Sequence, residues 1–454
     1  MKEIGRCGRK AVAGEFWPQT GLAYLAAVAS SKGHIVRIID GMVGSIAVKE
    51  MMSLIESFCP ELIVIITTTP TFNNDTNIVK IIKGRFNLVV GFVGTHVSSL
   101  PEESLMVSQA DFVFVNECEE TLVELINNLD EYWGGIKGLS FRDKNGEIRH
   151  NIDRPFIEDL DSLPYPARDL LPNQKYRIPF TKGNPFATII PSRGCPFHCI
   201  FCRAGKVWNK AVRYRSPANV FEEIEILVNK YDIKDFAFMT DSFTMNRSWA
   251  MELCEKICIN GLDVRWFCNS RVDSIDREML ELMKRAGCVL VSYGIESGDQ
   301  SILDNSRKQI TLEESVKAIR FTNEAGIISF AYFIFGLPGE THDTINKTIK
   351  FAKTLNARYV NFHIATPFPG TEFYDMAKKK NWLVSSNWDD YEEEGSAVIQ
   401  TEVLSPDELV AAQKMAMRTF YLRPGTILNE LRSINGINDL VSKLKAVKAL
   451  IKNF

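Results

Sequence analysis

The chain has 454 residues, too many for one ordinary hydrophobic core, and this length predicts about three domains. Its 53 Lys and Arg residues nearly balance its 56 Asp and Glu residues, for a formal net charge of −3, so the composition offers no basic surface for nucleic acid or anionic membranes. Hydrophobic residues at 45% and charged residues at 24% are ordinary values for a folded protein and exclude a largely disordered chain.

The apolar runs are too short for a membrane-spanning helix. Stretches such as 62–72 and 330–337 fall below the ~20 residues that a transmembrane helix needs. The first residues contain no apolar segment of the kind found in secretory signals. We therefore expect a cytoplasmic protein without a transmembrane segment, in which the 10 cysteines are reduced thiols or metal ligands.

Apolar strands alternate with amphipathic helices over residues 1–160, a pattern typical of a parallel sheet covered on both faces. The predicted helices are 22–31, 47–58, 75–83 and 119–128. The predicted strands are 34–40, 62–67, 87–91 and 111–116. A hairpin is expected at 138–148, around Asn145-Gly146. Met1–Glu15 is polar where a doubly wound domain usually opens with a core strand, which leaves open whether that strand is missing.

A second alternation of strands and helices begins near residue 186. Its predicted strands are 187–191, 235–240, 264–269, 289–296, 329–335 and 359–365. Its predicted helices are 220–230, 247–260, 277–286, 312–325 and 342–355. This repeat predicts a partial (β/α)6 barrel with its chemistry at the carboxyl ends of the strands. After Trp382 the pattern changes to an acidic segment, a helix at 406–421 and a Lys-rich C-terminal helix.

These patterns predict an α/β protein in three parts. Residues 1–160 form a Rossmann-like doubly wound domain, residues 161–384 the barrel, and residues 385–454 a small C-terminal helical domain. Ligands bind open parallel sheets at the carboxyl ends of the strands. The loops at 67–70, 94–96 and 117–119 are therefore candidate binding segments of the first domain.

Three cysteines follow the first predicted barrel strand within eight residues: Cys195, Cys199 and Cys202. A loop this short can place three thiolates around one [4Fe–4S] cluster, which leaves the fourth iron open to another ligand. One alternative is a structural zinc site with His198 as the fourth ligand, although such sites usually use paired CxxC half-sites. Three buried free thiols are the other alternative.

The CxxxCxxC spacing, with the aromatic Phe201 before the last cysteine and a barrel following, resembles the radical S-adenosylmethionine (SAM) superfamily. The resemblance implies that the three cysteines hold a [4Fe–4S] cluster and that the amino and carboxylate groups of SAM chelate its open iron. Reductive cleavage of SAM then gives methionine and a 5′-deoxyadenosyl radical, which abstracts hydrogen from an unactivated carbon. An anaerobic enzyme served by an electron donor such as flavodoxin or ferredoxin is implied.

The same resemblance places SAM contacts on the barrel loops, namely Phe201, Asp241, Asn269, Arg271, Glu296, Ser297 and Gly336. Asp241 stands where the superfamily usually has a Gly-Gly-Glu-like segment, whose glycines are absent here. For Arg271 two interpretations stay open. It could bind a carboxylate of SAM or substrate through two parallel hydrogen bonds, or it could form a salt bridge to Asp273 or Asp276. Gly336 lies in a segment similar to the one that packs on adenine.

The first domain resembles the cobalamin-binding domain of the B12-dependent radical SAM class in residues 17–25, 67–71 and 117–119, and residues 420–424 also resemble that class. The implied cobalamin contacts are Thr67, Thr68, Thr69, Gly94, His96 and Glu117. The chain has no Asp-x-His-x-x-Gly motif, so no axial histidine from that motif is expected. A solvated loop histidine is the alternative for His96. A nucleotide-binding or purely structural Rossmann-like domain is the alternative for the whole unit.

The two cofactors together imply methyl transfer, because a carbon radical can take a methyl group from methylcobalamin. A second SAM can then methylate the cobalamin again. We therefore expect a methyltransferase that acts on an unactivated carbon. The alternatives are a cyclase or oxidative enzyme with the same cofactors, a carrier without radical chemistry, and a methylthiotransferase with a second cluster on Cys7, Cys59 and Cys118. The substrate, whether small molecule, lipid or peptide, stays open because its contacts lie on variable loops.

Overall fold

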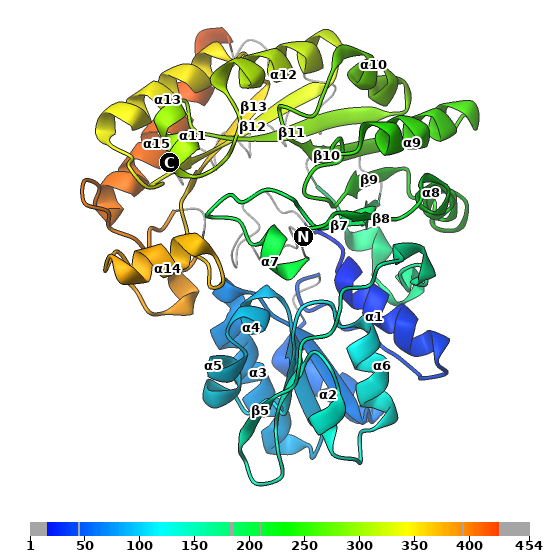
Figure 1. The fold of residues 1–454 in the computed structure, drawn as a ribbon. Helices are drawn as coiled ribbons and strands as arrows, with labels where there is room; N and C mark the ends of the chain where they lie inside the picture. The colour runs from blue at the N-terminus through cyan, green and yellow to red at the C-terminus, as the bar shows by residue number, and fades with distance from the viewer. Residues whose placement is uncertain are drawn as a thin grey trace.

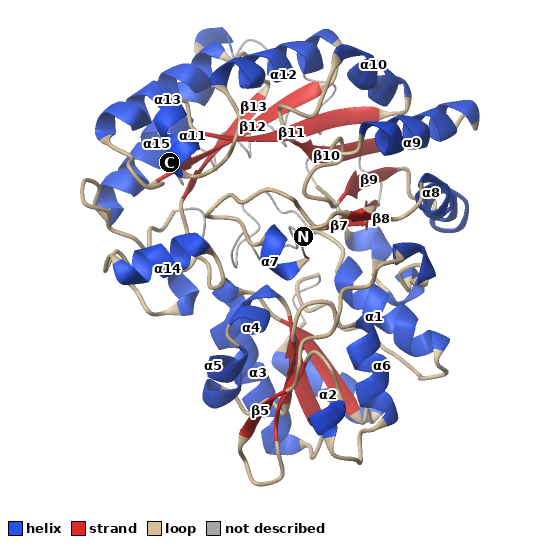
Figure 2. Cartoon of the chain, in the orientation of Figure 1, coloured by secondary structure: helices blue, strands red, loops and turns tan. Residues whose placement is uncertain are grey.

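The computed structural model describes residues 16–43, 46–178, 180–181, 185–208, 210–392 and 395–425. The chain forms two α/β units, a smaller N-terminal sheet with its helices and a larger barrel-like sheet (Figure 1). Helices lie outside the strands in both units, and helix α7 (Ala204–Val207) lies between the two (Figure 2). The predicted α/β fold class is confirmed.

The N-terminal sheet has the strand order β1-β2-β3-β4-β5. Strands β1 (Leu62–Ile66), β2 (Val89–Val93) and β3 (Phe112–Phe114) are parallel, and β4 (Leu139–Arg142) and β5 (Ile148–His150) form the predicted antiparallel hairpin. The remaining elements are α1 (Thr20–Ser31), α2 (Val48–Phe58), α3 (Phe72–Arg85), α4 (Thr95–Ser99), α5 (Pro101–Val107) and α6 (Glu119–Asn127).

Two separate cores cover the two faces of this sheet. One contains Val90, Phe92 and Val113 from the strands and packs against α2, α3, α4 and α5. The other contains Phe112 and Phe114 and packs against α1 and α6. Successive strand residues therefore enter opposite cores, as expected of a sheet with helices on both faces.

The predicted strand at 34–40 is wrong. Its alternating pattern does bury side chains in part, because Val36, Ile38 and Ile39 pack at the edges of three different cores. The backbone of this segment, however, joins no strand ladder, and Ile35 is 87% exposed. Partial burial alone mimics the period-two pattern of a strand, whereas a strand requires ladder hydrogen bonds. The polar segment 1–15 lies outside the described residues.

The larger sheet has six parallel strands in the order β13-β12-β11-β10-β9-β6, and all six predicted strands are confirmed. Their bounds are β6 (Phe186–Ile189), β9 (Asp235–Phe238), β10 (Arg265–Ser270), β11 (Cys288–Glu296), β12 (Ile328–Phe335) and β13 (Tyr359–Ile364). Within the described ranges β6 and β13 are edge strands of this sheet, so the barrel is partial.

The helices of the barrel begin at polar capping residues whose side chains accept a hydrogen bond from the backbone three residues on. Such caps precede α8 (Pro217–Tyr231), α9 (Arg247–Ile259), α10 (Arg277–Arg285), α12 (Leu312–Glu324) and α13 (His342–Thr354). A short helix that was not predicted, α11 (Gln300–Asn305), follows β11. These caps are local sequence signals, which explains why the helix positions could be predicted.

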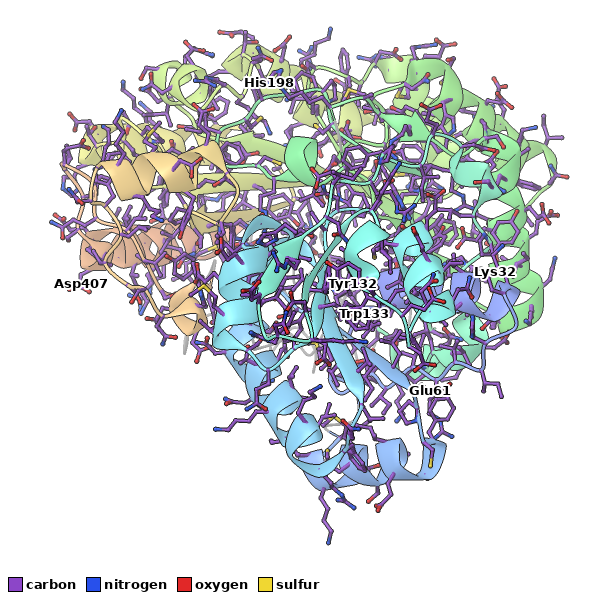
Figure 3. All side chains as sticks on the ribbon, turned by 60° about the horizontal axis from the view of Figure 1, so that its bottom comes forward. Lys32, Glu61, Tyr132, Trp133, His198 and Asp407 are labelled. Atoms are coloured by element: carbon purple, nitrogen blue, oxygen red, sulfur yellow. The ribbon has the colours of Figure 1, made fainter. Side chains whose placement is uncertain are left out.

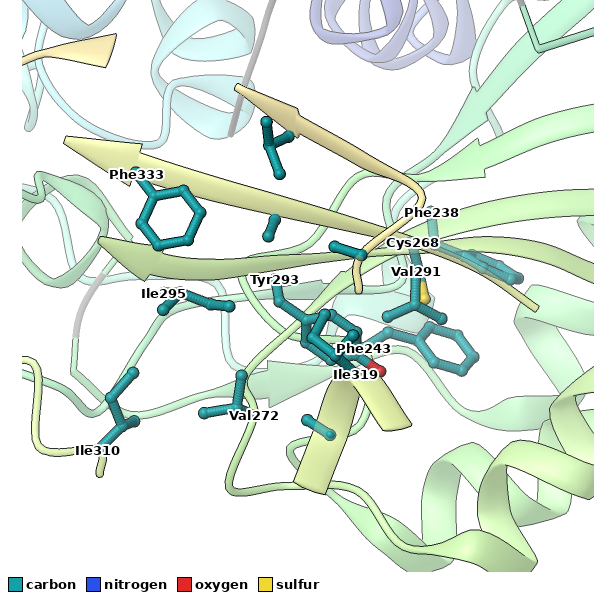
Figure 4. Packing of buried hydrophobic residues seen from close by; sticks show 14 of the residues in the cluster. Phe238, Phe243, Cys268, Val272, Val291, Tyr293, Ile295, Ile310, Ile319 and Phe333 are labelled. Carbon is teal, nitrogen blue, oxygen red and sulfur yellow. The ribbon is translucent and has the colours of Figure 1, made fainter. Parts of the chain in front are cut away.

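One hydrophobic core joins the barrel strands to their outer helices. Close to the middle of the sheet, the rings of Phe238 and Phe243 stack 4.7 Å apart beside Cys268 and Tyr293 (Figure 4). The same core continues into α15 (Pro406–Tyr421), which buries Leu409 and Phe420. Helix α15 comes after α14 (Glu372–Lys379) in the chain. The described residues after 384 therefore share the hydrophobic core of the barrel. The predicted C-terminal helix lies in residues 426–454, outside the described residues.

Among the residues that the structure describes, no helix has both the length and the apolar character that crossing a membrane requires.

The first two strand-end loops of the N-terminal sheet touch at Gly94, and this contact gives a testable prediction. Gly94 has φ +135°, and a Cβ there would lie 2.1 Å from the backbone oxygen of Thr67. We expect Gly94→Ala to lower the free energy of unfolding by at least about 2 kcal/mol, measured by urea denaturation. Gly84, in helix α3, has no atom within 4 Å of the added carbon, so Gly84→Ala should be neutral or stabilising. Equal stability of the two variants would contradict the close approach.

Candidate cofactor-binding site

The cysteine motif lies in a loop whose base is closed by a short antiparallel ladder that was not predicted. Strand β7 (Ser192–Arg193) pairs with β8 (Arg213–Tyr214), so residues on both sides of the loop are held together. Gly194 turns the chain with φ +107°, and no regular structure follows until α7. We call residues 194–203 the cluster loop.

The three sulfurs lie within electrostatic reach of one another. Burial, together with negative charge on Asp241, Cys202 and Cys199, raises the pKa of Cys195 to about 12. Burial also raises the pKa of Cys199, although the positive charge of Lys308 lowers that pKa in part. Because burial disfavours the charged form of these thiols, they become thiolates only beside a strongly positive group, which an iron cluster supplies. The donor set therefore fits a [4Fe–4S] group.

The zinc alternative finds no support in the geometry. Within the described ranges, no three His, Cys, Asp or Glu side chains converge closely enough to hold a single ion. His198, its expected fourth ligand, is exposed at the surface (Figure 3). A four-iron cluster is wider than one ion and is bound by thiolates that stand farther apart.

A buried ion pair lies close to the cluster loop. Lys308 Nζ donates to Glu296 Oε1 at 2.7 Å, and both side chains are buried. Burial alone would lower the pKa of Lys308, but the negative charges of Glu296 and Cys199 keep it raised. Lys308 was not predicted, because it comes from the turn after α11 and belongs to no sequence motif.

Backbone strain accompanies this pair. Glu296 has φ +72°, and the two neighbours of Lys308, Arg307 and Gln309, have φ +53° and +55°. Left-handed backbone at residues other than glycine is costly and concentrates at functional sites. The structure thus brings one predicted SAM contact, Glu296, to a strained turn beside the cysteines.

For Arg271 the salt-bridge interpretation is confirmed. Its Nε and Nη2 atoms donate to the two carboxylate oxygens of Asp273 at 2.9 and 2.8 Å, and Nη2 also donates to the carbonyls of Lys308 and Gln309. The guanidinium carbon lies 3.5 Å from the ring centroid of Phe197 in the cluster loop. Arg271 therefore binds the cluster loop and the Lys308 turn to β10, while Asp276 caps α10.

The other predicted SAM contacts divide into two groups. Asp241 is half-buried beside Cys195. Asn269 is half-buried near the end of β10, and Phe201 is half-buried in the cluster loop. Ser297, by contrast, is fully buried and bonded to the Thr348 hydroxyl and the Asp299 amide, so its partners are structural.

Gly336 forms a turn that a buried carboxyl holds. It has φ +91°, and its N–H donates to Oε2 of Glu340. Burial raises the pKa of Glu340 to about 8, against the hydrogen bonds from Gly336 and Leu337, so this carboxyl is largely protonated at neutral pH. The turn lies at the carboxyl end of β12, as predicted.

The predicted cobalamin residues lie at the carboxyl ends of β1 and β2. Thr67, Thr68 and Thr69 follow β1 and are buried. Thr68 caps the short helical turn Thr69–Thr71 through hydrogen bonds with Thr71. Gly94 follows β2 and lets the two loops meet. A Cβ at Gly94 would collide with the Thr67 carbonyl oxygen, so only glycine lets these two loops touch.

His96 is buried, so the solvated-loop interpretation is wrong. Its ring lies between those of Phe72 and Trp388, with centroids 4.4 and 4.9 Å away. Nδ1 shares a hydrogen bond with Thr69 Oγ1 at 3.2 Å, while Nε2 is buried and has no hydrogen-bond partner among the described residues. Burial, with the charge of Arg203, lowers the pKa of His96 to about 3, so the ring is neutral. An orphaned nitrogen here fits a polar group of a bound cofactor.

Glu117 follows β3 as predicted, but protein groups occupy its carboxylate. Arg213 donates to both oxygens at 2.8 Å, and the amide of Ile157 donates to Oε2. Arg193 adds a third positive contact at 3.4 Å. The observed partners make Glu117 a link between the two units rather than an open ligand contact.

Comparison with known proteins agrees with this geometry. Residues 189–352 match the radical SAM superfamily and residues 7–126 match the B12 binding domain. The chain is 35% identical over 431 residues to an uncharacterized methyltransferase of Pyrococcus horikoshii, covering 94% of this chain and 93% of that protein. It is 30% identical over 371 residues to the anaerobic magnesium-protoporphyrin IX monomethyl ester cyclase of Rubrivivax gelatinosus, covering 79% of this chain and 66% of that protein.

A solved structure shares the fold. The radical SAM methyltransferase TsrM of Kitasatospora setae, solved with cobalamin and a [4Fe–4S] cluster bound, superposes with a TM-score of 0.72 at 17% identity, covering 90% of this chain and 87% of that one. The chain belongs to the radical SAM superfamily, in the class that carries a B12-binding domain, and its cofactors are a [4Fe–4S] cluster, SAM and cobalamin.

Proposed function

We propose that this cobalamin-dependent radical SAM enzyme transfers a methyl group to an unactivated carbon. The observation that carries the proposal is the contact between Ser99, in the helix after β2, and Arg203, directly after Cys202. This contact places the segment after β2 of the N-terminal sheet next to the cluster loop of the barrel. Two cofactors bound at the two sets of strand ends would face each other there.

Cys195, Cys199 and Cys202 would hold the cluster. Asp241, beside Cys195, would hold the amino group of SAM, and Lys308 with Glu296, beside Cys199, would hold its polar atoms. The turn at Gly336 would support the adenine, and Asn269 and Phe201 would line the same space. Arg271 and Ser297 already have protein partners, so we assign them to holding the site together.

The N-terminal loops would hold cobalamin. Thr67, Thr68, Thr69 and Gly94 would border the cofactor at the ends of β1 and β2, and Nε2 of His96 would supply one buried polar atom for a group of the cofactor. The rings of Phe72 and Trp388 enclose His96, which is 0% exposed. We therefore assign His96 to the wall of the site rather than to the cobalt.

When bound, the cluster supplies the electron that splits one SAM, and cobalamin carries a methyl group taken from a second SAM. In balance, one substrate C–H, two SAM and two electrons give the methylated substrate, methionine, 5′-deoxyadenosine and S-adenosylhomocysteine. The hydrogen leaves on 5′-deoxyadenosine, and a protein such as flavodoxin or ferredoxin would supply the electrons. The protein orients the reacting carbon and excludes water.

The identity to the cyclase favours a second candidate, in which the same radical forms a ring or oxidises the substrate without methyl transfer. The structure gives no support to a methylthiotransferase. Cys118 is buried in the core against α6, Cys59 is exposed after α2, and Cys7 lies outside the described residues. The substrate class, whether small molecule, lipid or peptide, is open within both candidates.

Loss of one cluster ligand should abolish the chemistry. We expect Cys199→Ala to lose the bound iron and all 5′-deoxyadenosine formation after anaerobic reconstitution, because two thiolates cannot hold the cluster. Iron analysis and chromatography of the products measure this. Cys258→Ala, which removes a half-buried thiol of α9, is the matched control and should behave like the wild type. Retained SAM cleavage in Cys199→Ala would refute the ligand assignment.

The Asp241 assignment predicts weaker SAM binding with an intact cluster. Removing a charge-assisted hydrogen bond of about 1.5–3 kcal/mol should weaken SAM binding by roughly 10- to 100-fold in Asp241→Ala. The change that SAM causes in the electron paramagnetic resonance (EPR) spectrum of the reduced cluster gives the affinity. Asp263→Ala, at an exposed position before β10, is the control. Unchanged affinity would show that Asp241 does not touch SAM.

Product stoichiometry separates the two candidate functions. Methyl transfer should release S-adenosylhomocysteine and 5′-deoxyadenosine in equal amounts, with a substrate mass gain of one methylene. Cyclisation or oxidation should release 5′-deoxyadenosine alone. Mass spectrometry of anaerobic reactions measures all three quantities. Turnover without S-adenosylhomocysteine would contradict the methyltransferase.

A further inference from the structure

Buried arginines lie on both sides of the cysteine motif, and their partners belong to the other unit. Arg193, two residues before Cys195, donates from Nη2 to Glu119 Oε1 at 2.6 Å, at the start of α6. Both side chains are buried. The guanidinium also lies over the rings of Tyr24 and Trp208, at 5.8 and 5.1 Å. The entry to the cluster loop is therefore attached to the N-terminal unit.

A second arginine doubles this attachment. Arg213 lies opposite Arg193 in the β7–β8 ladder and binds Glu117 through two parallel hydrogen bonds of 2.8 Å. Two guanidinium groups thus meet two carboxylates, which leaves the group neutral. Burial by itself would raise the pKa of Glu119, but the charge of Arg193 and its hydrogen bond hold that pKa below its usual range. The Glu119 carboxylate is therefore ionised at neutral pH.

The exit of the cluster loop is attached to a different strand-end loop. Arg203 donates from Nη2 to Ser99 Oγ at the end of α4. A Cβ on Gly370, in the loop after β13, would lie 2.4 Å from the same Ser99 oxygen, so three segments meet closely here. The charge of Arg203 also reaches His96, in the wall of the proposed cobalamin site.

The middle of the loop, in contrast, is attached to the barrel. The amide of Ile200 donates to the carbonyl of Ser306, its own carbonyl accepts from the amide of Phe373, and Arg271 stacks on Phe197. The barrel thus holds the centre of the cluster loop, while the N-terminal unit holds both of its ends.

We propose that Arg193, Arg213 and Arg203 are positioning residues that set the separation between the cluster and cobalamin. The inference rests on the proposed cofactor sites. Breaking either attachment should leave both cofactors bound but change the distance between them. A pair that only stabilised the fold would change the unfolding temperature and leave that distance alone.

The test uses holoenzyme loaded with both cofactors and compares wild type with Glu119→Gln, Ser99→Ala and the double variant. EPR of the reduced cluster together with cob(II)alamin reports their magnetic interaction, which depends on distance. We expect this interaction in the wild type and its loss in the double variant, with iron and cobalt contents unchanged. We also expect S-adenosylhomocysteine formation without substrate to fall roughly 10- to 100-fold, because small misplacements are costly.

Arg247→Gln is the matched control, since it breaks an exposed ion pair with Asp276 between α9 and α10. It should leave the magnetic interaction unchanged. Ser99→Ala removes one hydroxyl and keeps the test informative if Glu119→Gln folds poorly. A wild-type interaction in Ser99→Ala and in every variant that binds both cofactors would overturn the positioning role. Absence of bound cobalt in the wild type would instead overturn the proposed function, and the inference with it.

Discussion

The arrangement of the molecule depends on one buried group of ion pairs, in which Glu117 and Glu119 of the N-terminal unit meet Arg193 and Arg213 of the barrel. Each parallel sheet places its own loops at its carboxyl edge, but neither sheet determines where the other one lies. The ion pairs constrain how the two units lie relative to each other. Buried pairs contribute little net stability, because loss of hydration offsets their attraction, yet a misplaced partner leaves a buried charge that costs about 3–5 kcal/mol. Their effect is therefore to select one orientation of the two units.

Within that frame the barrel concentrates strain and charge next to the cysteines. Three residues have left-handed backbone: Glu296, Arg307 and Gln309. Glu296 forms an ion pair with Lys308, which stands between Arg307 and Gln309 in the chain. Such a turn persists only where surrounding contacts hold it, and the hydrogen bonds from Arg271 to the Lys308 and Gln309 carbonyls are such contacts. The guanidinium of Arg271 also stacks on the ring of Phe197. One arginine thus links the cluster loop, the strained turn and the end of β10, which suits a site whose geometry must be fixed before SAM binds.

Local signals made much of this architecture predictable. Strand periodicity, polar caps and the cysteine spacing are properties of short segments, so the barrel strands, their helices and the cluster loop follow from the sequence. The partners of a side chain that come from distant parts of the chain cannot be predicted in this way. Whether Arg271 would bind a carboxylate of SAM or Asp273 depended on the final orientation of its side chain, and nothing near Arg193 in the sequence indicates Glu119. The segment 34–40 shows the converse error, since its alternating pattern suggested a strand where the backbone forms no ladder.

We propose that one chain holds a thiolate-bound iron cluster and a corrinoid at the strand-end loops of its two sheets. Elemental analysis of the anaerobically reconstituted protein, supplied with iron, sulfide and hydroxocobalamin and freed of unbound metal, tests it most directly. We expect about four iron atoms and about one cobalt atom for each chain, with no zinc. Zinc in place of iron would contradict the cysteine assignment, about eight iron atoms would indicate a second cluster, and the absence of cobalt would contradict the role of the N-terminal unit.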